Sequence, residues 1–205
     1  MRQGASDEAA ALVVAAEKAL KKFTFFDKTS KVEDAAEKYA GAGKLYGLAG
    51  NHEEAGKAFL RAAELHGQLG DDAAAGTAYQ SAGDALVQVD INAGIVSLQS
   101  AVQLHVRCSR GVTAANTVRQ IAELYQENAA ADEAIANYEE AALLFDSEKR
   151  AQTANQCREK IAFIAVEQGD HRRGALEFEA LGKAGLSSSL TKYNARSSFL
   201  KSLLW

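Results

Sequence analysis

The chain has 205 residues, of which 47% are hydrophobic and 24% charged, and this balance excludes an intrinsically disordered protein. A formal net charge of -4 argues against a general nucleic-acid binder, which normally carries a basic stripe. Proline is absent, helix-forming residues dominate, and β-branched runs are short. The composition therefore predicts an all-α protein.

Neither a secretory leader nor a membrane span is indicated. Residues 1–10 are polar, and no stretch approaches the ~18 consecutive apolar residues that a spanning helix needs. Cys108 and Cys157 lack the spacing of a metal site and are interpreted as reduced thiols. We expect a cytoplasmic protein that is at most peripheral on membranes.

Turn residues recur along the chain and divide it into helices of similar length. Gly suits the position after a helix, and Asn, Asp or Ser suits the N-cap of the next one. The predicted helices span residues 6–22, 31–48, 52–68, 72–88, 91–108, 112–127, 131–145, 148–168, 171–184 and 188–204.

The first predicted helix ends in an aromatic loop. Lys21 and Lys22 precede Phe23, Phe25 and Phe26. One interpretation is a small local core beneath the first helix pair. The other is a membrane-contact loop, in which the aromatic rings enter the bilayer while the lysines meet anionic headgroups. The sequence leaves both open.

From the second helix onward, a small residue is followed four positions later by an aromatic one, which places both on one helix face. The pairs are Ala35 with Tyr39, Ala55 with Phe59, Ala75 with Tyr79, Ala134 with Tyr138, and Gly174 with Phe178. On the same grid of about twenty residues, Leu98 and Val118 replace the aromatic, and Arg158 breaks the pattern. The period predicts a tetratricopeptide-like, right-handed α-solenoid of antiparallel helix hairpins, forming one domain over residues 1–205.

No catalytic constellation is present in the sequence. The four histidines form no His-Glu-x-x-His pair, and residues 41–44 only superficially resemble the end of a phosphate loop, because Leu45 stands where Ser or Thr is required. We therefore expect a protein that is not an enzyme and that binds no metal or cofactor.

Basic residues are numerous in the second half of the chain. They are Arg107, Arg110, Arg119, Lys149, Arg150, Arg158, Lys160, Arg172, Arg173, Lys183, Lys192, Arg196 and Lys201. A solenoid aligns equivalent helix faces, so some of these bases could share a concave surface that attracts an acidic partner. The alternative is an ordinary solvated surface.

Several segments resemble the alpha-SNAP family of soluble NSF attachment proteins. They are SKVEDAA (30–36), AGNHEEAGKAF (49–59), AAELH (62–66), IAELY (121–125), AIANYEEAA (134–142), ANQC (154–157) and LTKYNAR (190–196). The resemblance extends over the whole chain in one register and includes the aromatic loop.

The resemblance implies an adaptor in vesicle-mediated transport and membrane fusion, monomeric in isolation. Such proteins bind the assembled SNARE complex along a concave face and recruit the AAA ATPase N-ethylmaleimide-sensitive factor, which disassembles the complex. The family's SNARE-contacting positions correspond to Arg110, Leu190 and Arg196, and its membrane loop to the phenylalanine segment.

Two departures from the family are visible. Asn116 and Gln156 replace lysines of the SNARE-facing surface, a loss that Arg119, Arg158 or Lys160 could compensate. The chain also stops on an apolar helix, where the family continues into a C-terminal helical part that engages the ATPase. A generic tetratricopeptide-like peptide-binding scaffold and a purely structural fragment therefore remain alternative hypotheses.

Overall fold

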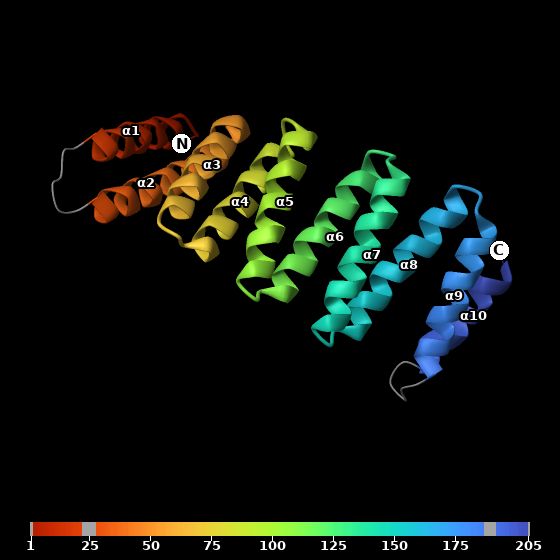
Figure 1. Ribbon diagram of the computed structural model, residues 1–205. Coiled ribbons are helices and arrows are strands. Elements are labelled where there is room, and N and C mark those ends of the chain that lie inside the picture. The colour runs from red at the N-terminus through yellow and green to blue at the C-terminus, as the bar shows by residue number, and fades with distance from the viewer. Residues whose placement is uncertain (1, 22–27, 187–191, 205) are drawn as a thin grey trace. The chain divides into compact units, whose positions relative to one another are not determined.

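The computed structural model describes residues 2–21, 28–186 and 192–204, and within these ranges all regular structure is helical. The helices are α1 (Arg2–Lys21), α2 (Lys28–Ala49), α3 (His52–Gln68), α4 (Asp72–Leu86), α5 (Ile91–Arg107), α6 (Gly111–Glu127), α7 (Ala131–Ser147), α8 (Ala151–Glu167), α9 (His171–Leu186) and α10 (Lys192–Leu204). Successive helices pack against one another from α1 to α5 and from α7 to α10, and short turns join the helices from α2 to α9 (Figure 1). The predicted all-α, tetratricopeptide-like repeat is confirmed.

Most helix bounds agree with the predicted ones, and one of the larger internal differences has a local cause. Helix α8 begins at Ala151 rather than at residue 148, because Lys149 has a φ of 56° that no helix accommodates. Helix α7 extends to Ser147, and α1 already begins at Arg2.

A left-handed residue closes six of the turns between helices. The residues with positive φ are Gly50, Gly70, Ser109, Ala129, Lys149 and Gly169. In each turn, the N–H of the residue after the left-handed one donates a hydrogen bond to a carbonyl in the last turn of the preceding helix. Examples are Asn51 to Tyr46 at 2.9 Å and Arg150 to Phe145 at 2.8 Å. This closure supplies partners for carbonyls that the helix end would leave unpaired.

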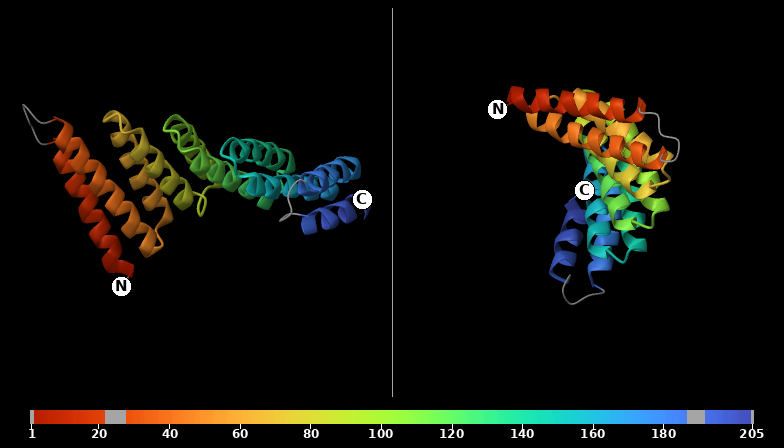
Figure 2. Two further views of the ribbon diagram at one scale, coloured as in Figure 1. Left: turned by 90° about the horizontal axis from the view of Figure 1, so that it is seen from below. Right: turned by 90° about the vertical axis from the view of Figure 1, so that its left-hand side faces the viewer.

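The chain divides into two compact units, residues 1–117 and 118–205, with the boundary inside α6. The expectation of one domain over the whole chain stays a prediction. Figure 2 shows the same helices from two further directions. Among the described helices, none combines the length and the apolar character needed to cross a bilayer.

In the first unit, helices pack closely because small residues face large ones. Ala35, Ala36, Ala62 and Ala63 are fully buried around Tyr39. A Cβ placed on Gly56 would approach the Leu86 side chain to 2.5 Å, so α3 and α4 meet at a distance that a larger residue would prevent.

In the second unit, Tyr138, Phe145 and Phe178 are the largest fully buried side chains. Phe178 of α9 packs edge-on against Phe163 of α8, with ring centroids 5.1 Å apart. Together with the first unit, this confirms the predicted repeat: every small residue of the pairs is buried, and so are all their aromatic partners except the half-buried Tyr79.

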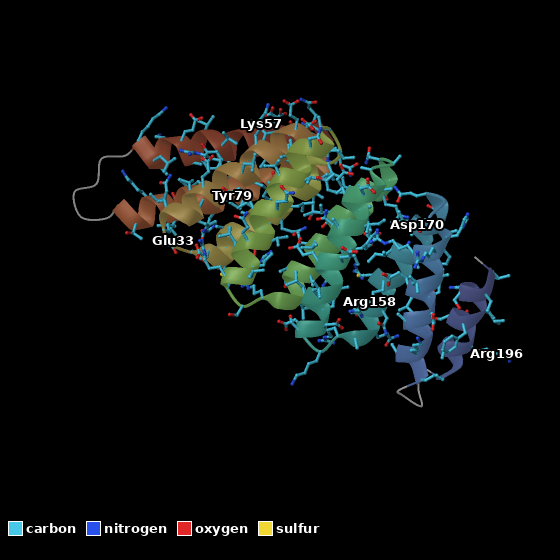
Figure 3. All side chains as sticks on the ribbon, turned by 45° about the vertical axis from the view of Figure 1, so that its right-hand side comes forward. Glu33, Lys57, Tyr79, Arg158, Asp170 and Arg196 are labelled. Carbon is cyan, nitrogen blue, oxygen red and sulfur yellow. The ribbon has the colours of Figure 1, made fainter. Side chains whose placement is uncertain are left out.

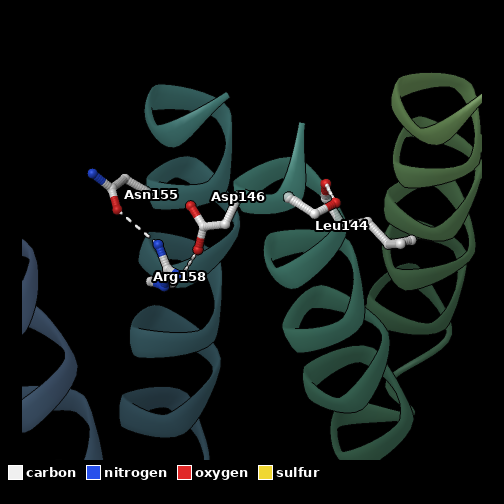
Figure 4. Close-up of polar contacts among 5 residues, drawn as sticks. Leu144, Asp146, Asn155 and Arg158 are labelled. Carbon is white, nitrogen blue, oxygen red and sulfur yellow. Dashed lines mark hydrogen bonds and ion pairs between the residues drawn. The ribbon is translucent and has the colours of Figure 1, made fainter. Parts of the chain in front are cut away.

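The exception to the repeat, Arg158, is accommodated by polar contacts (Figure 4). Its guanidinium donates to the Asn155 side-chain oxygen at 3.0 Å and forms an ion pair with Asp146 at the end of α7. The arginine therefore fastens α8 to α7 at a position where other repeats bury an apolar side chain.

Candidate binding face on helices α6, α8 and α10

Five of the predicted site residues cannot be placed. Lys22, Phe23, Phe25, Phe26 and Leu190 lie outside the described residues. The remaining member of the membrane-contact loop, Lys21, is the last residue of α1, where its exposed ammonium lies 3.8 Å from the Glu17 carboxylate.

The two predicted SNARE-contacting arginines are both exposed and belong to different units. Arg110 immediately precedes α6, and its carbonyl accepts the Ala114 N–H at 3.0 Å. Arg196 lies on α10, where Figure 3 labels it. The site described next is built from the second unit alone.

A groove of about 290 Å³ lies between α6 and α8 in the second unit. Its walls carry polar side chains that recur at helical spacing, so each wall is one face of a helix. The lining residues are Arg119 and Glu123 of α6, Tyr138 of α7, and Gln156, Cys157, Glu159, Lys160 and Phe163 of α8. We call it the α6–α8 groove.

The floor of the α6–α8 groove is apolar and uncharged. Tyr138 and Cys157 are each only 1% exposed. Burial raises the pKa of Tyr138 to about 12 and also raises the pKa of the Cys157 thiol, so both groups are neutral at physiological pH. The Tyr138 hydroxyl donates to the Gln126 side-chain oxygen at 2.9 Å, so its polar end already has a partner within the protein.

The rim of the groove carries a slight excess of positive charge. Arg119 lies 3.8 Å from Glu123, and Lys201 of α10 lies 2.5 Å from Glu159. Lys160 is exposed and forms no ion pair within the part of the chain that the structure describes. Three cations therefore stand against two carboxylates, and Lys160 supplies the excess.

Lys201 also contacts an aromatic residue that lines the groove. Its ammonium lies 4.9 Å from the Phe163 ring centroid and 5.4 Å from that of Phe178. Phe163 is 37% exposed, so part of this ring remains available beside the lysine.

A second hollow of about 300 Å³ adjoins the first on the other side of α8. It is lined mostly by amides and hydroxyls, namely by Gln152, Asn155, Gln156, Glu159, Leu181, Gly185, Ser197 and Ser198. Gln156 and Glu159 belong to both hollows and form the ridge between them. We call this one the α8–α10 hollow. The run of amides at helical spacing in α8 is the sequence signal that would have found it.

The structure separates the three bases that the sequence offered as substitutes for the missing lysines. Arg119 and Lys160 face each other across the α6–α8 groove. Arg158 instead lines a different hollow, with Glu139 and Glu177, and is engaged by Asp146. Only the first two can therefore act together on one partner.

Comparison with known proteins decides the family. The sequence matches the profile described as "Soluble NSF attachment protein, SNAP" over residues 7–205. The chain belongs to this soluble NSF attachment protein family. It is 33% identical to the alpha-soluble NSF attachment protein of Mus musculus over 98% of this chain and 70% of the mouse protein. It is 32% identical to the beta-soluble NSF attachment protein of Bos taurus, with the same coverage.

Solved structures support the fold independently of the soluble NSF attachment protein family. BtubC from P. vanneervenii superposes with a TM-score of 0.55 at 13% identity, covering 98% of this chain and 87% of that one. At this identity the likeness concerns the fold alone.

Two described positions, Asn116 and Gln156, differ from the lysines that the family resemblance predicts. Asn116, on the part of α6 that belongs to the first unit, is exposed and bonds the Val112 carbonyl at 2.9 Å. Gln156 is exposed on the ridge between the two hollows. Both stand where the resemblance predicts lysines, so this family member presents amides in place of two charges.

Proposed function

We propose that this chain is an adaptor that binds assembled SNARE complexes and links them to the AAA ATPase N-ethylmaleimide-sensitive factor for disassembly. The observation that carries the proposal is the ridged face of α6, α8 and α10 in a soluble NSF attachment protein family member. The chain contributes binding and positioning, and the ATPase contributes the chemistry.

The shape of this face suits a helical bundle better than a small molecule. Its two hollows, of about 290 and 300 Å³, are at or below the lower end of the volumes typical of small-molecule sites. They lie side by side along α8 and share a polar ridge, so a partner must be broad enough to contact both. Neighbouring helices of a bundle offer such a surface.

Charge favours an acidic partner, but weakly. Lys160 supplies one positive charge at the α6–α8 groove that no described carboxylate pairs with, and the exposed Arg196 lies on α10. Such rim charges raise the association rate and set orientation more than they add affinity. The Gln156 amide on the ridge then contributes hydrogen bonds in place of the long-range attraction that a lysine would supply.

A pull-down of purified, soluble SNARE complex by this chain tests the proposal, with isolated SNARE helices as the comparison. Selective capture of the assembled complex is expected. Equal capture of single helices would favour the generic peptide-binding scaffold instead. Capture of neither at low salt would refute the adaptor function.

Charge reversal tests the face itself. Lys160→Glu should weaken binding several-fold at low salt and less at high salt, because exposed charges are screened. Arg172→Glu makes the same charge change at an exposed position of α9 that lines neither hollow, and should leave binding unchanged. Equal losses in both variants would show that only net charge matters.

We also propose a peripheral, cytoplasmic location, with membrane contact through the loop that contains Phe23, Phe25 and Phe26. Three aromatic side chains with adjacent lysines give weak and reversible attachment. Attachment of this kind would hold the adaptor near membrane-anchored SNARE complexes and would release it after disassembly.

A further inference from the structure

The α6–α8 groove differs chemically from the rest of the binding face. Its floor is formed by the Tyr138 ring, the Cys157 thiol and one side of Phe163, all uncharged, and charged groups stand only at its rim. The α8–α10 hollow beside it is lined instead by amides and hydroxyls. An apolar centre enclosed by polar groups is the arrangement in which single side chains contribute most to binding between proteins.

We infer that the α6–α8 groove is an anchor pocket, which receives one large apolar side chain from the surface of a helix in the bound SNARE bundle. This inference rests on the proposed function and assigns that partner a specific chemistry. The side chain projects from a helix surface, and an acidic residue stands within about one helical turn of it.

The size of the groove limits the occupant. A volume of about 290 Å³ is too small for a helix to enter, but it accommodates a leucine, methionine or phenylalanine side chain with the adjoining part of its backbone.

The rim charges supply the second element of recognition. Glu123 and Glu159 are each neutralised by a neighbouring cation, at 3.8 and 2.5 Å respectively. Lys160 also lines the groove and forms no ion pair with any residue that the structure describes. A carboxylate next to the inserted side chain would pair with this ammonium, whereas a lysine there would be repelled.

The aromatic layer beneath the groove holds the pocket open. Phe163 packs edge-on against the fully buried Phe178, and Lys201 lies over both rings. Arg119 is held 5.7 Å from the centroid of the buried Phe145 ring. Because these contacts fix both walls before a partner arrives, little ordering remains to be done on binding.

Filling the groove with a side chain of this chain tests the inference. In Glu123→Phe, an aromatic ring replaces an exposed wall carboxylate, and removal of a negative charge should by itself favour an acidic partner. Binding of soluble SNARE complex is measured by isothermal titration calorimetry, with helicity and thermal unfolding followed by circular dichroism. We expect roughly tenfold weaker binding, largely independent of salt, because the pocket is already occupied.

The matched control is Glu140→Phe, which makes the same substitution at an exposed position of α7 that lines no hollow of this face. It should bind as tightly as the parent. Gln156→Phe fills the groove from the opposite wall without changing charge, and keeps the test decisive if Glu123→Phe unfolds.

The outcomes separate this inference from the proposed function. If the parent protein binds SNARE complex and both Glu123→Phe and Gln156→Phe fold and bind equally well, the anchor pocket is overturned. The adaptor function would still stand. Failure of the parent to bind SNARE complex would overturn both. Equal weakening in Glu140→Phe would also overturn the pocket, because the effect would not be local.

Discussion

Replacing Lys149 with glycine should stabilise the second unit. Lys149 closes the turn between α7 and α8 with a φ of 56°, in the left-handed region that disfavours a Cβ. Its N–H donates to the Asp146 carbonyl at 2.9 Å, and Arg150 N–H donates to the Phe145 carbonyl at 2.8 Å. Glycine can make the same backbone bonds without the steric cost.

The expected gain follows from two opposing terms. A non-glycine residue in the left-handed region costs about 1–2 kcal/mol, whereas glycine has about 0.5–1 kcal/mol more unfolded-state entropy to lose. The Lys149 side chain is exposed and forms no ion pair within the described residues, so its loss should cost little. Lys149→Gly should therefore raise the free energy of unfolding by about 0.5–1 kcal/mol, measured by urea denaturation with circular dichroism.

Two controls separate this turn effect from a general response to glycine. Glu140→Gly, on the exposed face of α7, should destabilise by about 1 kcal/mol, because glycine is a poor helix residue. Gly169→Ala, at the equivalent turn with a φ of 83°, should also destabilise. If Lys149→Gly lowers stability as Glu140→Gly does, the left-handed conformation of Lys149 does not carry the expected steric cost.

Three further predictions concern packing, pH and membrane contact. Gly174→Ala should lower the free energy of unfolding by about 1–3 kcal/mol, because its Cβ would lie 2.4 Å from the Val166 side chain. In the same urea assay, Gly67→Ala should be neutral or stabilising, because its Cβ would meet nothing within 4 Å. Burial, and secondarily the Arg110 charge, lower the pKa of His105 below its usual 6.5, and neither ring nitrogen has a hydrogen-bond partner among the described residues. The unfolded chain then binds the proton more tightly, so the free energy of unfolding should fall as the pH decreases below 6.5. His105→Leu should flatten this pH dependence in urea melts across pH 5–8. An unchanged pH dependence would contradict the role of His105. Replacing Phe23, Phe25 and Phe26 together with serine should abolish liposome flotation without loss of helicity. Collapse of the fold would instead indicate that these residues form a local core.

The fold could be predicted because its determinants repeat. Small residues such as Ala55 and Ala134 are buried at a fixed interval, and each lies next to an aromatic side chain on the same helix face. One repeat confirms another, so the weak local signal at any single position matters little. The turn predicted between residues 127 and 131 is also present, although Ala129 rather than glycine has the positive φ there.

The helix bounds failed where a local conformation departed from residue preference. The sequence predicts a turn before residue 148, but it places Lys149 inside the next helix, because lysine is a good helix former. The left-handed turn forms there because the buried faces of α7 and α8 fix where each helix must stop. Tertiary packing therefore overrides local propensity at this turn.

The binding face was only partly predictable. Arg119 and Lys160 were identified as bases, but their position on opposite walls of one groove depends on how α6 and α8 pack. Arg158 could not be distinguished from them by sequence, although the structure engages it with Asp146 on another surface. Charge can be counted along a chain, whereas the grouping of charges requires the fold.

Most polar residues of the binding face occupy helix positions other than those that maintain the repeat, whereas Tyr138 and Cys157 belong to both sets. On α8, Ala154, Cys157 and Ile161 are buried and maintain the repeat, while Gln156 and Lys160 point outward beside them. The outward positions can therefore change without loss of the solenoid, consistent with 33% identity to the mouse protein over nearly the whole chain. The proposed function therefore predicts that affinity for the SNARE complex depends more on shape and hydrogen bonding than on charge, because Asn116 and Gln156 carry no charge. Its salt dependence should accordingly be smaller than that of a relative with lysines at both positions.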